Sequence, residues 1–188
     1  MKPISSPPAA APTILLLGLL PLVLAGAGSA NPFVVHEDCL DAEHVVVEES
    51  ATPLPTDPAE LRSMLWQGFV DREICDRFQC PVREAAWQWD RFAGSLARKA
   101  AAAGLDGDSL ARCLDALHED AGGRIELPIQ ASLARQEGRP VWVILVKWES
   151  GPHPDDAGDA RPDVLLGHVS VHALDAADGR PLAIASCR

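Results

Sequence analysis

Between residues 58 and 122, apolar residues recur at the spacing of α-helices, in three runs separated by helix-ending residues. The first predicted helix begins at Asp57 and Pro58, which suit the N-cap and the first helical position, and it ends before Pro81. The second predicted helix follows Pro81 and ends at Gly104. The third begins near Asp108 and ends at residues 122–123. The core-facing residues of these helices would be Leu61, Leu65, Ile74, Phe78, Val82, Trp89, Phe92, Leu96, Leu110, Cys113, Leu114 and Leu117.

After residue 124 the apolar period changes to two, which is typical of β-strands. The first predicted strand, 125–133, contains Pro128, which indicates an edge strand. Residues 141–148 are apolar on both faces, as in a central strand covered by helices. Strands at 165–174 and 181–187 would flank a hairpin turn. The fold expected is therefore α+β, with three N-terminal helices followed by a four-stranded antiparallel β-meander, in a single domain over 58–188.

Residues 31–57 are acidic and contain neither lysine nor arginine. Residues 43–48 have the composition of one short strand, and the prolines of 52–56 favour extended backbone. We expect an acidic extended arm and linker, held to the domain by Cys39.

The N-terminus has the order of a secretory signal peptide. Lys2 is the only charge in the first 30 residues, an apolar run covers 14–27, and small residues follow to Ala30. A membrane-spanning helix needs about 20 apolar residues, and two glycines and a proline interrupt this run. We expect a signal peptide over 1–30, cleaved after Ala30 or Ala27, and an extracytoplasmic protein, periplasmic or secreted, without a membrane span after cleavage.

Charge and composition exclude several classes of protein. The formal charge of the 188-residue chain is −11, which argues against nucleic-acid binding because phosphates need clustered lysine and arginine. Apolar residues make up 47% of the chain, enough for a packed core.

Five cysteines are present in the chain predicted to be exported. In an oxidising compartment an odd number indicates disulfides and one remaining thiol, and the sequence leaves the pairing open. Neither C-x2-C nor C-x-x-C-H occurs, so no redox motif or haem attachment is indicated, and no cofactor is expected. The disulfide candidates are Cys39, Cys75, Cys80, Cys113 and Cys187.

His36, Cys39 and His44 form a candidate metal site in the acidic segment. Imidazole and thiolate are ligands of zinc and copper, and the neighbouring carboxylates would concentrate cations. Structural zinc sites normally show paired ligands at short spacing, which this segment lacks, so the alternative is a disulfide at Cys39.

Two histidines and a serine alternate along one predicted strand. His168, Ser170 and His172 share one face, which we interpret as a solvated polar face. The two histidines would lie about 13 Å apart, too far to share a metal ion.

No catalytic motif is present: neither G-x-S-x-G nor H-E-x-x-H nor a phosphate-binding glycine loop occurs. We assign no catalytic residue. An enzyme whose site is assembled only in the fold, for example with Cys113 and a histidine, stays open.

Trp87 is the candidate contact for a protein partner. On a helix, Trp87 and Trp89 would lie about 200° apart, so both cannot face one core. An exposed tryptophan is a common anchor of protein interfaces.

The last hairpin, residues 168–182, resembles the V-x-V-x-A-x-x-G-x-x-L hairpin of PepSY domains. The resemblance covers about 20 residues and implies a small extracytoplasmic helix-and-sheet module, cystatin-like in shape, of a kind often linked to peptidase inhibition or regulation. It assigns no site residue.

Together these features predict an exported, disulfide-containing binding protein that regulates or inhibits an envelope or extracellular protein. The alternatives are an extracytoplasmic metal-handling protein that uses His36, Cys39 and His44, and an enzyme whose site the sequence does not reveal.

Overall fold

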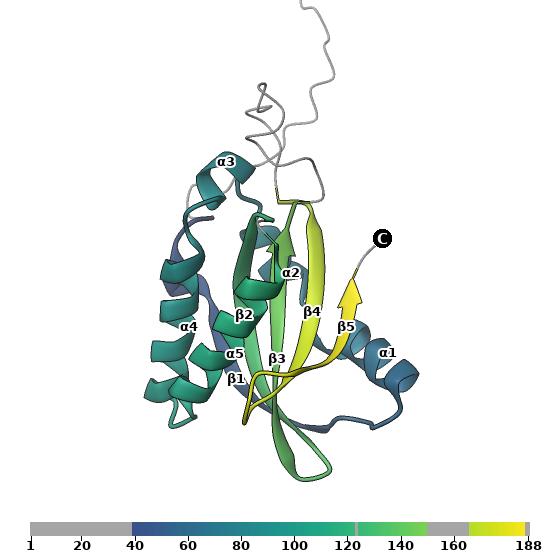
Figure 1. The fold of residues 1–188 in the computed structure, drawn as a ribbon. Coiled ribbons are helices and arrows are strands. Elements are labelled where there is room, and N and C mark those ends of the chain that lie inside the picture. The colour runs from purple at the N-terminus through teal and green to yellow at the C-terminus, as the bar shows by residue number, and fades with distance from the viewer. Residues whose placement is uncertain (1–38, 123, 150–165, 187–188) are drawn as a thin grey trace, which may run out of the picture. The chain divides into compact units, whose positions relative to one another are not determined.

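A single mixed sheet runs through the part of the chain that the computed structural model describes, residues 39–122, 124–149 and 166–186 (Figure 1). The strand order is β1-β2-β3-β4-β5. β1 is parallel to β2, and the remaining neighbours are antiparallel. The strands are β1 (Val46–Pro53), β2 (Glu126–Gln136), β3 (Arg139–Trp148), β4 (His168–Asp175) and β5 (Pro181–Ser186).

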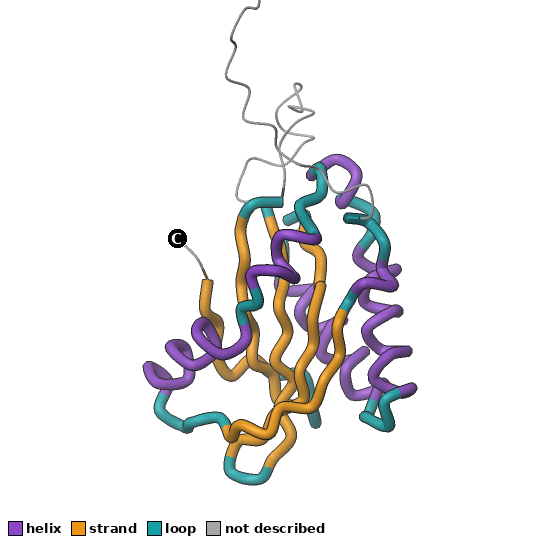
Figure 2. Tube along the Cα trace, turned by 180° about the vertical axis from the view of Figure 1, so that it is seen from behind, coloured by secondary structure: helices purple, strands orange, loops and turns teal. Residues whose placement is uncertain are grey.

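Helices cover both faces of this sheet (Figures 1 and 2). One face carries α4 and α5, and we call it the α5 face; the opposite face carries α1 and α2. Trp142 of β3 donates its indole N–H to Ser109 of α5 at 3.1 Å, whereas Lys147 donates to the Cys75 carbonyl of α2 at 3.0 Å. β3 is therefore buried on both sides, which explains its apolar run. The helices are η1 (Ala42–His44), α1 (Pro58–Phe69), α2 (Arg72–Arg77), α3 (Val82–Ala85), α4 (Trp89–Ala102) and α5 (Gly107–Asp120).

The predicted four-stranded antiparallel meander after three helices is wrong, although the fold is α+β. Residues 46–53 form a fifth strand, β1, which lies between η1 and α1 in the chain and pairs in parallel with β2. The Glu48 carboxylate accepts hydrogen bonds from Gln130 Nε2 at 3.1 Å and from Ser132 Oγ at 2.9 Å. These contacts join segments more than 80 residues apart, which local periodicity does not reveal.

Two of the predicted helices are each divided in two. The first ends at Phe69, and α2 begins after Asp71, whose carboxylate caps the backbone N–H groups of Glu73 and Ile74. The second is divided into α3 and α4 by the turn that carries Trp87. The start of α1 is as predicted, since Asp57 accepts from the N–H groups of residues 59 and 60.

The edge position predicted from Pro128 is also wrong, because β2 lies between β1 and β3. Pro128 is tolerated for two reasons. The register with β3 shifts between Pro128 and Gln130, and β1 pairs with β2 only from Gln130 onward.

No described helix is both long enough and apolar enough to cross a membrane.

The β4–β5 turn packs closely against α5. Gly179 has a φ of 73°, and a Cβ added there would lie 3.2 Å from the Ala116 Cβ and 3.3 Å from the Arg112 carbonyl oxygen. Glycine is therefore required here both by conformation and by close approach. This contact holds α5 over the end of β4.

Candidate functional site

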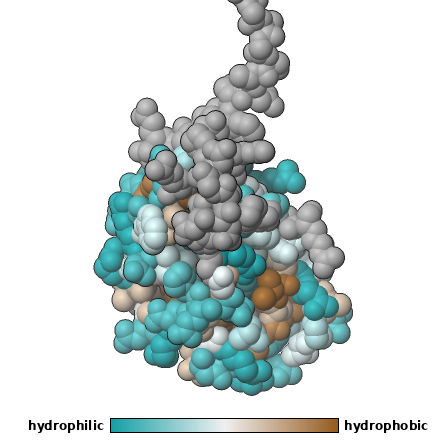
Figure 3. All heavy atoms as spheres, turned by 45° about the horizontal axis from the view of Figure 1, so that its top comes forward, coloured by the Kyte–Doolittle hydropathy of each residue, from teal (hydrophilic) through white to brown (hydrophobic). Residues whose placement is uncertain are grey.

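A cavity of about 340 Å³ lies between the end of α5 and strands β4 and β5. Figure 3 shows a hydrophobic patch within a largely hydrophilic surface on the side where Figure 1 draws β5. The cavity is lined by Ala116, Leu117, Glu119, Asp120, His172, Leu174, Gly179, Pro181 and Ile184.

His172 is the buried polar residue of this cavity. It lies on the α5 face of β4, between Ile144 and Ile184 of the neighbouring strands, and only 7% of it is exposed. The Ser170 hydroxyl oxygen lies 2.8 Å from His172 Nε2. Burial lowers the pKa of His172 to about 4, helped by Arg124 and opposed by Asp120. The ring is therefore neutral near neutral pH.

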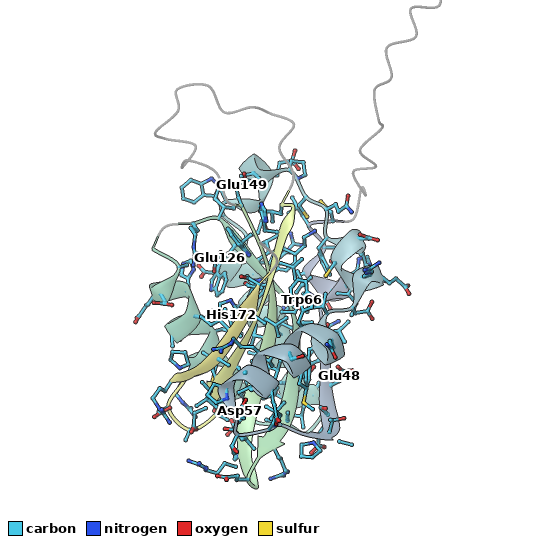
Figure 4. All side chains as sticks on the ribbon, turned by 90° about the vertical axis from the view of Figure 1, so that its right-hand side faces the viewer. Glu48, Asp57, Trp66, Glu126, Glu149 and His172 are labelled. Atoms are coloured by element: carbon cyan, nitrogen blue, oxygen red, sulfur yellow. The ribbon has the colours of Figure 1, made fainter. Side chains whose placement is uncertain are left out.

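A second buried polar group, Glu126, lies on the same face of the sheet (Figure 4). Its Oε1 atom is 3.3 Å from the Arg124 guanidinium, and its Oε2 atom is buried without a hydrogen-bond partner among the described residues. Burial raises the pKa of Glu126, and Arg124 opposes this shift. Arg124 and Asp120 influence the pKa of both Glu126 and His172, so these four groups form one electrostatic cluster.

Trp148 of β3 lies beside these polar groups on the α5 face of the sheet. It pairs with Glu126 on one side and with His168 on the other. The His168 ring stacks on the indole at a centroid distance of 4.8 Å, and the Arg124 guanidinium carbon lies 5.6 Å from the indole centroid. Within the part of the chain that the structure describes, the buried indole Nε1 has no hydrogen-bond partner.

The interpretation of residues 168–172 as a solvated polar face is wrong. His168, Ser170 and His172 do share one face, but Ser170 and His172 are only 5% and 7% exposed and His168 is half-buried. No local pattern indicates this burial, because the α5 residues that line the cavity with His172 lie some fifty positions earlier in the chain. Ser170 does not line the cavity, so the Ser170–His172 pair presents no nucleophile to it.

The candidate metal ligands are only partly within the described residues. His36 lies outside them, Cys39 is buried, and His44 Nε2 lies 4.0 Å from the Asp41 carboxylate. In the part of the chain that the structure describes, no three histidine, cysteine, aspartate or glutamate side chains are grouped to hold a metal ion. The metal site stays a prediction.

Cys39, Cys80 and Cys113 are buried free thiols, Cys75 is buried as well, and Cys187 lies outside the described residues. Cys80 Sγ donates to the Cys39 carbonyl at 2.7 Å, and Cys113 Sγ to the Asp175 carbonyl at 3.6 Å. Burial raises the pKa of Cys113 to about 11 and raises that of Cys39. In the folded protein these thiols are poor nucleophiles, because the reactive form is the thiolate and a raised pKa disfavours it. The disulfides stay a prediction.

Trp87 and Trp89 lie in opposite environments. Trp87, in the turn between α3 and α4, is 89% exposed. Trp89 is buried and stacks on His118 at a centroid distance of 4.5 Å.

Comparisons with protein-family models, curated proteins and solved structures found no match to this chain. β4 and β5 are antiparallel neighbours, and the resemblance of this hairpin to PepSY domains stays a prediction.

Proposed function

We propose that this is an exported protein that acts by binding another protein, and that Trp87 anchors the binding surface. The observation that carries the proposal is the 89% exposure of Trp87. The next most exposed tryptophan among the described residues is Trp66, at 37%. A large indole in water is a favourable anchor, because burying it in a partner removes much apolar surface from solvent.

The backbone around Trp87 is held in place. The N–H of Ala86 donates to the Val82 carbonyl at 3.1 Å, and that of Gln88 to the Ala85 carbonyl at 3.0 Å. On the C-terminal side of Trp87, the Phe92 N–H donates to the Gln88 carbonyl at 3.1 Å. A fixed corner loses little conformational entropy on binding, which supports its use as an anchor.

Charge indicates the kind of partner. The formal charge of the chain is −11, so a partner with a basic surface would be attracted over a distance. The predicted signal peptide places the encounter outside the cytoplasm, and the PepSY resemblance favours a regulated partner such as a peptidase.

The test has two parts. The mass of the protein recovered from the extracytoplasmic fraction gives the cleavage site, expected after Ala30 or Ala27. Affinity capture from that fraction then compares the wild type with Trp87→Ala, and with Trp66→Ala as a matched control. A partner retained by the wild type and the control but lost with Trp87→Ala supports the proposal. Equal capture by all three, or an uncleaved protein in the cytoplasm, contradicts it.

A further inference from the structure

Two cysteines that are distant in the chain lie in contact in the fold. Cys39 precedes η1, and Cys80 lies 41 positions later, in the connection between α2 and α3. Cys80 Sγ donates to the Cys39 carbonyl at 2.7 Å, and the two thiols are also hydrogen-bonded to each other. Cys39 is 3% exposed and Cys80 is 0% exposed. The fold therefore brings together two sulfur atoms that the sequence leaves unpaired.

The backbone on both sides of this contact is held in place. The Cys80 carbonyl accepts from the Leu166 N–H at 2.9 Å. After Cys39, the Asp41 carboxylate accepts from the Glu43 N–H at 2.9 Å and caps η1. The two sulfur atoms are not bonded in this structure. A rotation of the Cys80 side chain, from the Cys39 carbonyl towards the Cys39 sulfur, would bring them towards the bonding distance of about 2.05 Å.

Cys113 lies away from this pair. Its Sγ donates to the Asp175 carbonyl at 3.6 Å, and its Cα is part of the close contact between α5 and Gly179 of the β4–β5 turn. Figure 1 shows this turn and α3 at opposite ends of the sheet. Cys113 is therefore the thiol that we expect to stay reduced.

We propose that Cys39 and Cys80 form a disulfide, which ties the acidic N-terminal segment to the start of α3. The oxidant is a disulfide, either oxidised glutathione or the disulfide of a thiol oxidoreductase. One cysteine thiolate attacks the oxidant, forms a mixed disulfide and releases the first thiol. The second cysteine then attacks this mixed disulfide, closes the Sγ–Sγ bond and releases the second thiol. Two electrons and two protons pass from the protein to the oxidant.

Burial determines when this bond forms. Burial raises the pKa of Cys39 and of Cys80, and Lys147 opposes the shift in both, so the folded protein holds few thiolates at this site. An oxidant also has little access to side chains that are 0% and 3% exposed. The exchange therefore takes place before folding is complete, and the bond is a permanent link. Cys39 in a disulfide offers no thiolate, so the proposal argues against the metal-handling alternative.

The bond would enclose η1, β1, α1 and α2 in one covalent loop. It would also fix the chain directly before α3, the helix that leads to the turn carrying Trp87. Its formation in the cell rests on the proposed export, because an oxidising compartment supplies the oxidant. The refolding experiments below need neither export nor a partner of Trp87, so failure of this proposal and failure of the proposed function are distinguishable.

Peptide mapping of the refolded full chain tests the pairing. The reduced, unfolded chain is refolded with reduced and oxidised glutathione, its remaining thiols are blocked with N-ethylmaleimide, and it is cleaved with trypsin. Trypsin places the five cysteines on separate peptides, since Arg77 lies between Cys75 and Cys80 and other basic residues separate the rest. We expect linked peptides containing Cys39 and Cys80, and a blocked Cys113. Blocked thiols at both Cys39 and Cys80, or a link from either to another cysteine, overturns the proposal.

Thermal unfolding tests whether the bond stabilises the fold. Each refolded protein is measured before and after reduction, so the packing cost of a substitution cancels. Reduction should lower the Tm of the wild type by about 10 °C, because the unfolded chain is no longer constrained by a closed loop. Cys39→Ala combined with Cys80→Ala should remove this loss, and Cys113→Ala, the matched control, should keep it. An equal loss in the double variant, or none in the wild type, overturns the proposal.

The order of folding and oxidation tests the role of burial. Oxidised glutathione present from the start of refolding should link Cys39 and Cys80 at least about tenfold faster than the same oxidant added after refolding without it. Quenching with N-ethylmaleimide at timed intervals, followed by the same peptide mapping, measures both rates. Equal rates would show that the folded protein exposes these thiols, and would overturn the formation of the bond before burial.

Discussion

The Ser170 hydroxyl lies 2.8 Å from Nε2 of His172, two residues further along the same face of β4. This contact holds one ring nitrogen of an imidazole that is only 7% exposed and that lines the cavity between α5 and strands β4 and β5. Two predictions depend on this face of the sheet, and three test other parts of the fold.

The first prediction is a loss of stability in mild acid caused by His172. Its pKa is about 4 in the folded protein, below the ordinary value of 6.5. Above pH 6.5 the His172 ring is neutral in both the folded and the unfolded protein, so its contribution to the free energy of unfolding is fully present. As the pH falls towards 4, only the unfolded chain takes up a proton, so the free energy of unfolding decreases by about 3 kcal/mol.

Urea unfolding of the wild type and His172→Gln over this pH range checks the prediction. Taking the difference in unfolding free energy between the two proteins at each pH removes the contributions of titratable groups that lie far from His172. The wild type should lose stability more steeply than the variant as the pH falls. Parallel curves would show that His172 is not buried as described.

The second prediction concerns the hydrogen bonds that join α5 to the sheet. Ser109 Oγ accepts from Trp142 Nε1 at 3.1 Å and donates to the Ala176 carbonyl at 2.5 Å. Ser109→Ala leaves both partners buried and unsatisfied, so it should lower the unfolding free energy by about 1–3 kcal/mol. Urea denaturation measures this, and a variant as stable as the wild type would rule out the contact.

The third prediction tests the parallel pairing of β1 with β2. Glu48→Ala removes the acceptor for Gln130 and Ser132, both of which are buried, and should cost about 1–3 kcal/mol. Glu49→Ala is the control on the same strand, because Glu49 is exposed like Glu48 but its side chain accepts no hydrogen bond from β2 among the described residues, and the change should alter stability by less than about 0.5 kcal/mol. Equal effects in thermal unfolding would argue against the described register.

The fourth prediction contrasts two neighbouring tryptophans. Trp89→Ala opens a cavity in the core and should cost about 3–5 kcal/mol, whereas Trp87→Ala should change stability by less than about 0.5 kcal/mol. Denaturant midpoints measure both. Strong destabilisation by Trp87→Ala would mean that the indole packs within the protein and does not face a partner.

The fifth prediction concerns thiol reactivity. Burial raises the pKa of Cys39, Cys80 and Cys113, so in the reduced, folded protein these thiols should react with iodoacetamide much more slowly than after unfolding. Mass spectrometry after timed alkylation counts the modified sites. Fast modification of Cys113 in the folded state would instead favour the enzyme alternative.

Local features were well predicted by the sequence, and features that depend on distant segments were not. Asp57 and Pro58 mark the start of α1, and Gly179 marks the β4–β5 turn, because caps and turns depend on adjacent residues. The break before α2 had a local signal in Asp71, a good N-cap, but the helical spacing of apolar residues continues through it.

The cavity and the pairing of β1 with β2 could not be predicted, because both depend on contacts across the fold. The short strand expected at 43–48 overlaps β1, but its sequence does not indicate a partner strand. Glu48 contacts Ser132, 84 positions later. His172 is enclosed because α5 folds back over β4, and its two carboxylate neighbours, Glu119 and Asp120, belong to that helix. Periodicity identified the shared face of Ser170 and His172, but it did not identify what covers that face.

Site-specific photo-cross-linking at position 87 tests the proposed function most directly. A photoreactive phenylalanine analogue replaces Trp87 in one protein and Gln67, an exposed residue of α1, in another, and both are illuminated in the extracytoplasmic fraction. A discrete cross-linked protein formed from position 87 and absent from position 67 is the predicted result. No adduct, or the same adducts from both positions, would contradict binding through Trp87.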